Sequence, residues 1–516
     1  MSDIAQLAQE LSRLGARYVF GIPGEGASLQ LLTELEQRGC TFDAVGHEGA
    51  AALMAGGFGR VTGMPGVCLS IKGPGFTNLL AGITSNWLDH NPCLSLSESY
   101  GPGSSPTRMH KRLAHASMAK PVVKAYADNP SPEFMAHLWN LCLTEEPGPV
   151  HVDISASLTG QTYESWGIEQ PLVPLPGSVV QRIGSSLKPV VVVGAMATRR
   201  GWREMLAALR IPVFTTVAGK GVLNEASPWA AGVFTNAGGP GSPERAILPH
   251  ADLVIGLGLR TTELLDDTSL GTPLIVLDEL PNRARGLATV EEVLAKEEAV
   301  REALQHLLEK EWGQAEVQIS RKKLKTRFEM DRWLPADVLA LTQVRLPADT
   351  RFVLDTGNFC TIGEHALIAR FPDQVMGSPC GRSMGISLPV GIGAALGLPG
   401  VRTVVVVGDG GVRMYPEAMT VAIRRKLPLI VMVMTDGYYS SVRQAAVAKA
   451  LTQNPVKLDR CRWSAVFRAM GCASERIQSP SALESALKAW QSTEGPLVLE
   501  LVFDPDAYMN MTEGLR

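Results

Sequence analysis

The stretch Val404-Val405-Val406-Val407-Gly408-Asp409-Gly410-Gly411 joins a run of β-branched residues to a glycine-rich turn that carries one carboxylate. The run predicts a buried strand, and the glycines let backbone N–H groups approach an anion closely. A helix-like stretch, Pro416–Lys426, and a second apolar strand, Leu429–Met434, return the chain to the same edge of the sheet. There Asp436 offers a second oxygen beside Asp409. Carboxylate oxygens are ligands that Mg²⁺ prefers, so the stretch predicts a site for a metal ion and a diphosphate.

The same alternation of short apolar runs and helical patterns continues along almost the whole chain. It is typical of doubly wound, parallel α/β sheets. The predicted strands are Tyr18–Ile22, Val67–Ile71, Cys93–Leu96 and Val150–Ile154 in the first third, Pro189–Gly194, Val213–Val217, Leu253–Gly258 and Leu274–Asp278 in the middle third, and Phe352–Gly357, Val404–Val407, Leu429–Met434 and Leu497–Phe503 in the last third.

Two stretches without this alternation divide the chain. Residues 160–177 are rich in Pro and Gln and predict a linker. The charged stretch 291–325 predicts a solvated connecting helix. We therefore expect three α/β domains, over residues 1–160, 178–330 and 335–516.

Composition narrows the class of protein. A chain of 516 residues is too long for one core, and 45% hydrophobic with 19% charged residues is ordinary for a globular protein. A net charge of −3 gives no reason to expect nucleic acid or an anionic membrane as partner. The eight cysteines form no C-x-x-C pair, so neither a zinc site nor a disulfide framework is indicated. Without a signal-peptide core or an apolar run of ~18 residues, the sequence predicts a cytoplasmic protein.

A second motif near the start of the chain, His47-Glu48-Gly49-Ala50-Ala51-Ala52, accompanies the aspartate pair. Together with Pro428 and Thr435-Asp436-Gly437-Tyr438-Tyr439, it resembles the signature of thiamine diphosphate-dependent enzymes. The branch is that of acetohydroxyacid synthases, benzoylformate decarboxylase, pyruvate decarboxylases and oxalyl-CoA decarboxylase. The resemblance implies a pyrimidine-binding, a central and a diphosphate-binding domain. It also implies a homodimer or homotetramer with active sites between the first domain of one subunit and the third of another.

The resemblance assigns the catalytic role to Glu48. In the family this glutamate hydrogen-bonds the pyrimidine and favours the tautomer whose nitrogen removes the thiazolium proton. The cofactor carries the hard chemistry and the protein tunes it. The alternative for Glu48 alone is a helix N-terminal glutamate stabilised by the helix dipole. The distant aspartate pair favours the catalytic interpretation.

The resemblance also implies cofactor contacts in both outer domains. The turns at Pro23 and at Gly73-Pro74-Gly75 with Asn78 would pack against the pyrimidine. Met384 would force the cofactor into its bent conformation. The alternative is that Met384 is an ordinary hydrophobic-core residue. Asp409, Asp436 and the Tyr438 carbonyl would hold Mg²⁺. The complete cofactor-binding set is Pro23, Glu48, Asn78, Gly357, Asn358, Phe359, Arg382, Met384, Asp409, Gly410, Gly411, Asp436, Tyr438, Tyr439 and Ser440.

Four positions depart from the family pattern. Asp436 stands where asparagine is usual, a substitution that Mg²⁺ tolerates. Ala445 replaces the tryptophan of acetohydroxyacid synthases, which argues against branched-chain biosynthesis, and Lys111 replaces a glutamine. Lys72 precedes Gly73 where a small residue is usual; it either faces an anionic substrate group or reaches solvent. Substrate or acid–base candidates are Lys72, His90, His110, Lys111, His115, Ser441 and Arg443.

We therefore expect thiamine diphosphate-dependent decarboxylation of a small-molecule 2-oxo acid, followed by release of an aldehyde or ligation to a second carbonyl. The sequence leaves release and ligation open. A non-catalytic relative is the alternative, against which Glu48, Met384 and Asp409 argue. The sequence also lacks the dinucleotide-binding fingerprint that a nicotinamide dehydrogenase would carry. No G-x-G-x-x-G follows residues 190–193, so FAD is not expected either.

Overall fold

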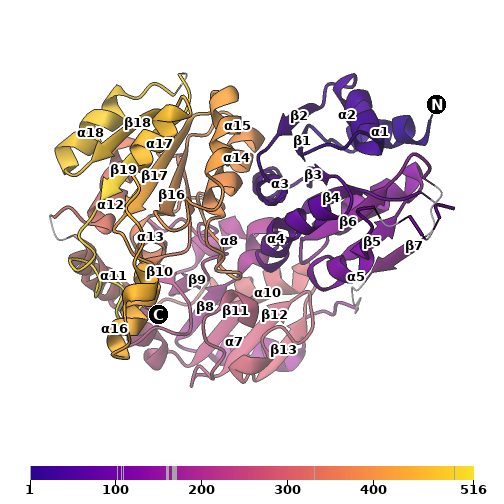
Figure 1. Ribbon diagram of the computed structural model, residues 1–516. Helices are drawn as coiled ribbons and strands as arrows, with labels where there is room; N and C mark the ends of the chain where they lie inside the picture. The colour runs from indigo at the N-terminus through magenta and orange to yellow at the C-terminus, as the bar shows by residue number, and fades with distance from the viewer. Residues whose placement is uncertain are drawn as a thin grey trace.

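The structure of the protein is a computed structural model that describes residues 2–101, 103–105, 107–108, 110–158, 162–165, 171–329, 332–492 and 494–515. It contains three mainly parallel sheets, each with helices packed against it (Figure 1). The first sheet is drawn in indigo and purple, the second in magenta and pink, and the third in orange and yellow. The predicted fold class is confirmed.

The first sheet has seven strands in the order β2-β1-β3-β4-β6-β5-β7, with only β7 antiparallel to its neighbour. Its strands are β1 (Tyr18–Gly21), β2 (Thr41–Ala44), β3 (Gly66–Ser70), β4 (Cys93–Glu98), β5 (Ala125–Asp128), β6 (Pro149–Ile154) and β7 (Thr162–Ser165). Its helices are α1 (Asp3–Arg13), α2 (Ala27–Glu36), α3 (Glu48–Thr62), α4 (Pro74–Leu88), α5 (His115–Ala119) and α6 (Met135–Leu143).

The central sheet has six parallel strands in the doubly wound order β10-β9-β8-β11-β12-β13. They are β8 (Pro189–Val193), β9 (Val213–Thr215), β10 (Ala230–Val233), β11 (Leu253–Leu257), β12 (Leu274–Asp278) and β13 (Glu291–Leu294). The helices of this part are α7 (Gly177–Ser185), α8 (Arg203–Ala208), α9 (Pro243–Ile247), α10 (Glu297–Leu307) and α11 (Gln314–Phe328).

The third sheet has six parallel strands in the order β15-β14-β16-β17-β19-β18. They are β14 (Arg351–Leu354), β15 (Val375–Met376), β16 (Thr403–Gly408), β17 (Leu429–Thr435), β18 (Ala473–Ile477) and β19 (Leu497–Val502). The helices are α12 (Pro335–Arg345), α13 (Asn358–Ala366), α14 (Ser387–Gly397), α15 (Met419–Arg424), α16 (Ser440–Ala448), α17 (Trp463–Ala469) and α18 (Pro480–Ala489). β16 and β17 pair in register from Thr403 opposite Leu429 to Gly408 opposite Met434, which brings their carboxyl ends together as predicted.

Two connecting stretches differ from their predictions. β7 lies within the stretch 160–177, so part of the expected linker is an edge strand of the first sheet. The single solvated helix expected over 291–325 is wrong. Glu291–Leu294 is strand β13, and α10 buries Ala299, Val300, Ala303, Leu304 and Leu307 in the core of the central sheet. The charged residues of α10 occupy its outer face only.

Helices α3 and α14 join the first and third sheets through one shared core. Glycines on both helices allow the backbones to approach closely. A Cβ on Gly57 would lie 2.2 Å from the Val390 carbonyl oxygen, and one on Gly393 would lie 2.0 Å from that of Met54. One hydrophobic cluster accordingly runs from Phe20 in β1 through both helices to Val498 in β19. The two outer parts of the chain are thus packed as one body.

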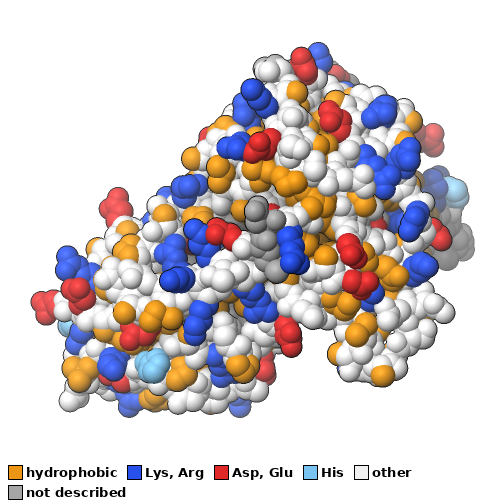
Figure 2. All heavy atoms as spheres, turned by 90° about the vertical axis from the view of Figure 1, so that its left-hand side faces the viewer, with side chains coloured by type: hydrophobic (Ala, Val, Ile, Leu, Met, Phe, Trp, Pro, Cys, Tyr) orange, Lys and Arg blue, Asp and Glu red, His pale blue; other side chains and the backbone are white. Residues whose placement is uncertain are grey.

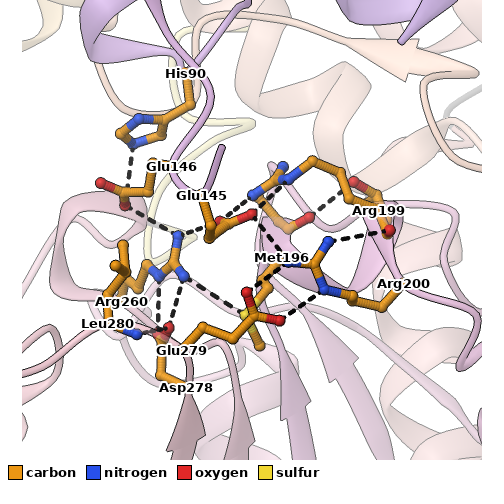
Figure 3. Close-up of polar contacts among 12 residues, drawn as sticks. His90, Glu145, Glu146, Met196, Arg199, Arg200, Arg260, Asp278, Glu279 and Leu280 are labelled. Atoms are coloured by element: carbon orange, nitrogen blue, oxygen red, sulfur yellow. Dashed lines mark hydrogen bonds and ion pairs between the residues drawn. The ribbon is translucent and has the colours of Figure 1, made fainter. Parts of the chain in front are cut away.

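A buried charge cluster joins the first sheet to the central one (Figure 3). Arg260 is 1% exposed and donates to both carboxylate oxygens of Asp278, at 2.6 and 2.8 Å, and to Glu145 and Glu146, at 2.7 and 3.1 Å. Arg199 also binds Glu145. Burial alone would raise the pKa of Glu145, but the two guanidinium groups lower it to about 2. The cluster lies at the carboxyl ends of the central strands.

Figure 2 shows one face of the molecule, on which basic and acidic side chains are interspersed with apolar ones. This surface agrees with the small net charge and shows no extended patch of one sign. Within the part of the chain that the structure describes, no helix is long and apolar enough to cross a membrane.

Candidate active site

Glu48 is the first residue of α3, directly after the N-cap residue His47. Its side chain is 6% exposed and accepts a hydrogen bond of 3.0 Å from Nδ2 of Asn78 in α4. The first turn of α4 passes close to it, because a Cβ on Gly75 would lie 3.2 Å from the Glu48 carboxylate. Pro23 is half-buried between β1 and α2. The structure therefore brings Glu48 and Asn78 together at one end of two helices.

A buried polar network holds the turn before α4. The amide of Gly73 donates to Nε2 of His115 at 3.0 Å, so the ring proton lies on Nδ1 and is donated to Asp153 at 2.8 Å. Tyr126 and His151 also donate to Asp153. Although burial raises the pKa of Asp153, the two histidines leave it below its ordinary value. His115, His151 and Asp153 lie close enough to hold a metal ion, but these bonds already use their ligand atoms.

Three cations surround Tyr100 near the same turn. Lys72 Nζ lies 5.5 Å from the ring centroid, and the guanidinium carbons of Arg108 and Arg112 lie 5.4 and 4.4 Å from it. Lys72 also forms an ion pair of 3.5 Å with the buried Glu98. An internal anion therefore accompanies Lys72, and a substrate anion is not needed to explain its position. Lys111 contributes its backbone to the turn, since a Cβ on Gly73 would lie 2.3 Å from its carbonyl oxygen.

The second group lies where β16 and β17 end. Oδ2 of Asp409 accepts from the Gly437 amide at 2.9 Å, which places Asp409 beside the Asp436 loop. Oδ1 of Asp436 accepts from the Tyr438 amide at 2.9 Å, and its Oδ2 accepts from the hydroxyls of Ser440 and Tyr508. Burial, and secondly the charge of Asp436, raise the pKa of Asp409 to about 7. Two carboxylates that repel each other in this way are suited to a divalent cation.

The glycines of the loop have a packing role besides any contact with an anion. A Cβ on Gly410 would lie 2.5 Å from the ring of Tyr439, and one on Gly411 would lie 2.1 Å from Oδ2 of Asp355. Any side chain at either position would displace these neighbours. The sequence interpretation, which assigned the glycines to anion approach alone, is therefore incomplete.

Two buried polar atoms near this loop have no hydrogen-bond partner among the described residues. They are Nδ2 of Asn358, whose residue is 4% exposed, and Oγ of Ser441. Asn358 is the first residue of α13, and no side chain caps that helix after Gly357. Phe359 packs its ring against Gly357 and Gly408. An unpaired amide donor at an uncapped helix N-terminus fits a phosphate group.

The segment between β15 and α14 is held in place by hydrogen bonds from its backbone amides to Asp355. This fully buried carboxylate accepts from the amides of Gly385, Ile386 and Ser387, and burial raises its pKa to about 6. Met384 is half-buried beside it. Arg382 has a positive φ of 47° and pairs with the buried Glu364 at 2.6 Å. Its guanidinium is thus already bound to a carboxylate.

Three other candidates lie in different surroundings. His90 follows the far end of α4 and lies 3.5 Å from Glu146 in the charge cluster of Figure 3. Arg443 is 8% exposed, binds Gln453 and Asp506, and stacks 4.4 Å from the Tyr438 ring centroid. His110 is exposed and its carbonyl accepts from Tyr100. The structure does not bring His90 to the Glu48 group.

Sequence reasoning missed the groups that support the candidate residues: Tyr126, His151, Asp153, Glu364 and Tyr508. Four of them act on partners 18 to 72 positions away, whereas His151 lies two positions from Asp153. A polar residue inside an apolar run, as in Val150-His151-Val152-Asp153-Ile154, was the only signal available. Such a residue in a buried strand requires a partner.

The residues present fit thiamine diphosphate with a divalent cation. Asp409 and Asp436 are hard oxygen ligands beside each other, and Asn358 with the start of α13 offers donors to a phosphate. Glu48 is a buried carboxylate held by Asn78. Among the described residues, no hydrogen bond or ion pair joins the Glu48 group to the Asp409 group within the chain.

Comparison with known proteins gives matches along the chain. Models of the N-terminal, central and C-terminal domains of thiamine pyrophosphate enzymes match residues 3–118, 177–293 and 355–501. A probable 2-ketoarginine decarboxylase of Pseudomonas aeruginosa is 28% identical, covering 96% of this chain and 93% of its own. An acetolactate synthase of Bacillus subtilis is 24% identical (96% and 92%), and an acetolactate synthase large subunit of Corynebacterium glutamicum is 28% identical (98% and 87%).

The matched models describe successive parts of one kind of enzyme, and each falls on one of the three sheets. The chain therefore belongs to the thiamine pyrophosphate enzyme family.

Proposed function

We propose that the protein uses thiamine diphosphate and Mg²⁺ to decarboxylate a 2-oxo acid, and that it then releases an aldehyde or joins the acyl fragment to a second carbonyl. The proposal is carried by the presence of two separate groups in one chain. The first is the buried Glu48 bound by Asn78, and the second consists of Asp409, Asp436 and the Asn358 amide, which has no partner among the described residues. A non-catalytic relative would not need to retain both groups.

Glu48 would hold and tune the pyrimidine ring. When bound, the cofactor supplies a nucleophilic carbon for the substrate carbonyl and accepts the electrons left by CO₂. The buried carboxylate of Glu48 would accept a hydrogen bond from a protonated ring nitrogen, while Asn78 keeps the carboxylate oriented. The His115 network would keep the adjacent turn in place through the Gly73 amide. These residues orient and exchange protons, and they leave the carbon chemistry to the cofactor.

Asp409 and Asp436 would hold Mg²⁺, with the Tyr438 carbonyl as third protein ligand. Asn358 and the start of α13 would bind the terminal phosphate, and Ser441 offers a further hydroxyl nearby. Gly357, Phe359, Gly410, Gly411 and Tyr439 would shape the loops around the diphosphate. Arg382 would act through the backbone of its segment, because its side chain binds Glu364.

The residues around the Gly73 turn bear on the charge of the substrate. Lys72, Arg108 and Arg112 make this region basic, which favours a 2-oxo acid or acceptor with a second anionic group. Glu98 offers a carboxylate in the same region and makes a cationic substrate the competing possibility. The relatives named above include both a decarboxylase and synthases, so release and ligation remain two outcomes of one proposed chemistry.

We also propose that the central domain binds no flavin. In doubly wound sheets, ligands bind outside the carboxyl ends of the strands at the switch point, here between β8 and β11. At that point Glu263 accepts from the Ala195 amide at 2.9 Å and from Thr216 at 2.6 Å. Arg260 fills the neighbouring space and binds Asp278. The chain's own groups thus take the donors that a phosphate would use. A flavin absorbance spectrum from the purified protein would contradict this proposal.

We propose further that the active protein is a homodimer or homotetramer. Among the residues that the structure describes, no hydrogen bond or ion pair joins Glu48 and Asn78 to Asp409 and Asp436. Large apolar side chains in the same regions are exposed: Leu113 by 46%, Met414 by 44% and Val442 by 56%. Contacts between subunits would cover them. Light scattering on the purified protein tests this, and an active monomer would contradict it. A cytoplasmic location stays a prediction from the sequence.

The decisive experiment supplies the purified protein with thiamine diphosphate, Mg²⁺ and one 2-oxo acid at a time. The panel contains a small neutral acid, a dicarboxylic acid and 2-ketoarginine, each with and without a second carbonyl compound. Mass spectrometry of the products separates release from ligation. Matched reactions without the cofactor provide the control. If no acid of the panel is consumed, the non-catalytic alternative is favoured.

A further inference from the structure

The chain beyond β19 folds back over the aspartate loop. Residues 503–515 are held by Asp506, which binds Arg443 at 2.6 Å, and by Arg327, which donates to the Met511 carbonyl at 2.9 Å. Tyr508 lies in the middle of this segment, is 3% exposed and packs its ring 6.2 Å from that of Phe503. Its hydroxyl donates to Oδ2 of Asp436. A residue near the C-terminus thus contacts a proposed metal ligand directly.

Both carboxylate oxygens of Asp436 accept hydrogen bonds from other residues of the chain. Its Oδ1 accepts from the Tyr438 amide, and its Oδ2 accepts from both Ser440 and Tyr508. None of these donors is a cation. The three bonds fix the carboxylate plane, and donors to an ionised oxygen withdraw part of its charge.

The charge of Asp436 creates a problem that an asparagine would not. It places a second carboxylate beside Asp409, and both would face a diphosphate that is itself an anion. Like charges in a partly buried site repel strongly. Two hydroxyl donors on one oxygen would reduce this repulsion.

We propose that Tyr508, with Ser440, is a positioning residue that orients Asp436 and offsets its additional negative charge, so that aspartate can serve in the metal–diphosphate site. This inference rests on the proposed function, because it assumes that Asp436 faces Mg²⁺ and the cofactor. It assigns the C-terminal segment a role in cofactor binding that the aspartate motif alone does not reveal.

The test is a double-mutant cycle read by calorimetric titration of thiamine diphosphate at saturating Mg²⁺. Tyr508→Phe removes the hydroxyl and keeps the ring, and we expect it to weaken cofactor binding about ten- to a hundred-fold, the effect of a lost hydrogen bond to a charged group. In an Asp436→Asn background the same change should alter affinity by less than about three-fold, because no carboxylate remains to be offset. Ser440→Ala should show the same dependence on Asp436 with a smaller loss.

Tyr163→Phe is the matched control, because the Tyr163 side chain in β7 is 39% exposed and its hydroxyl bonds, among the described residues, to His137. It should leave cofactor affinity unchanged, and melting temperatures should confirm that every variant is folded. An equal loss in both backgrounds would mean that Tyr508 only supports the fold, and a loss under two-fold would mean that it does nothing here; either result overturns the inference. Absence of binding by the unmodified protein would instead refute the proposed function, and the inference with it.

Discussion

Replacing Arg260 by methionine removes the centre of the charge cluster between the first and central sheets. Asp278 is fully buried and receives both of its short ion-pair bonds from Arg260. Among the described residues, the variant leaves its carboxylate with the Leu280 amide at 3.0 Å as sole donor. Glu145 keeps Arg199, and Glu146 keeps Arg283. The loss is therefore concentrated at one buried carboxylate, and about 3–5 kcal/mol of unfolding free energy should disappear.

Urea denaturation followed by far-UV circular dichroism measures this loss. Arg210→Met is the matched control, because Arg210 and Glu311 form an ion pair of 3.1 Å with side chains 64% and 61% exposed. That exposed pair should contribute at most about 1 kcal/mol. Adding Asp278→Asn to Arg260→Met should recover part of the loss, since the orphaned charge is then absent. If Arg260→Met destabilises no more than the control, the cluster does not hold the two parts together.

Four further predictions concern the site and its surroundings. Glu48→Gln should bind thiamine diphosphate within a few-fold of the wild type but turn over at least ~100-fold more slowly in steady-state assays; near-normal turnover would remove Glu48 from the mechanism. Asp409→Ala should abolish Mg²⁺-dependent cofactor binding in calorimetry, and unchanged affinity would show that the metal site is misplaced. Lys72→Met should raise the Michaelis constant for a substrate with a second anionic group. It should hardly change the melting temperature, because Glu98 keeps its hydrogen bond from Ser28. If both proteins process that substrate equally well, Lys72 does not bind the anionic group. Burial raises the pKa of Glu263 from 4.5 to about 7, so between these pH values the folded protein holds a proton that the unfolded chain releases. The unfolding free energy of the wild type should therefore fall by up to roughly 3 kcal/mol as the pH rises from 4.5 to about 7. Glu263→Gln should escape this decline, whereas parallel stability curves would contradict the assignment.

The strands that the sequence predicts are those in the interior of the three sheets. Interior parallel strands are buried on both faces and read as continuous apolar runs, such as Val190-Val191-Val192-Val193 in β8. The missed strands β2, β7, β10, β13, β15 and β18 lie at sheet edges, where one side is open and polar residues are tolerated. Glu291–Leu294 of β13 shows this, because its paired glutamates resemble a helix start. Only β5 was missed in an interior position.

Local motifs explain how far the site could be predicted. Glu48, Asp409 and Asp436 lie in short stretches whose residue types and spacing are informative by themselves. Tyr508 lies 72 positions from Asp436, and Asp153 lies 38 positions from His115, so no pattern within a window joins them. Arg382 and Arg443 were candidates because of their motifs, but Glu364 and Asp506 bind their side chains. Partners of this kind follow from tertiary packing alone.

The packing of α3 against α14 has a consequence for biosynthesis. The Ala- and Gly-rich face of α3 is covered by residues 387–397, which leave the ribosome about 340 residues later. At ~5–20 residues per second the nascent first domain would wait roughly 15–70 s for its partner. During that interval its apolar helix is open to chaperones and to neighbouring nascent chains. The order of synthesis thus makes the N-terminal part of this chain the point at which folding in the cell is most exposed to failure.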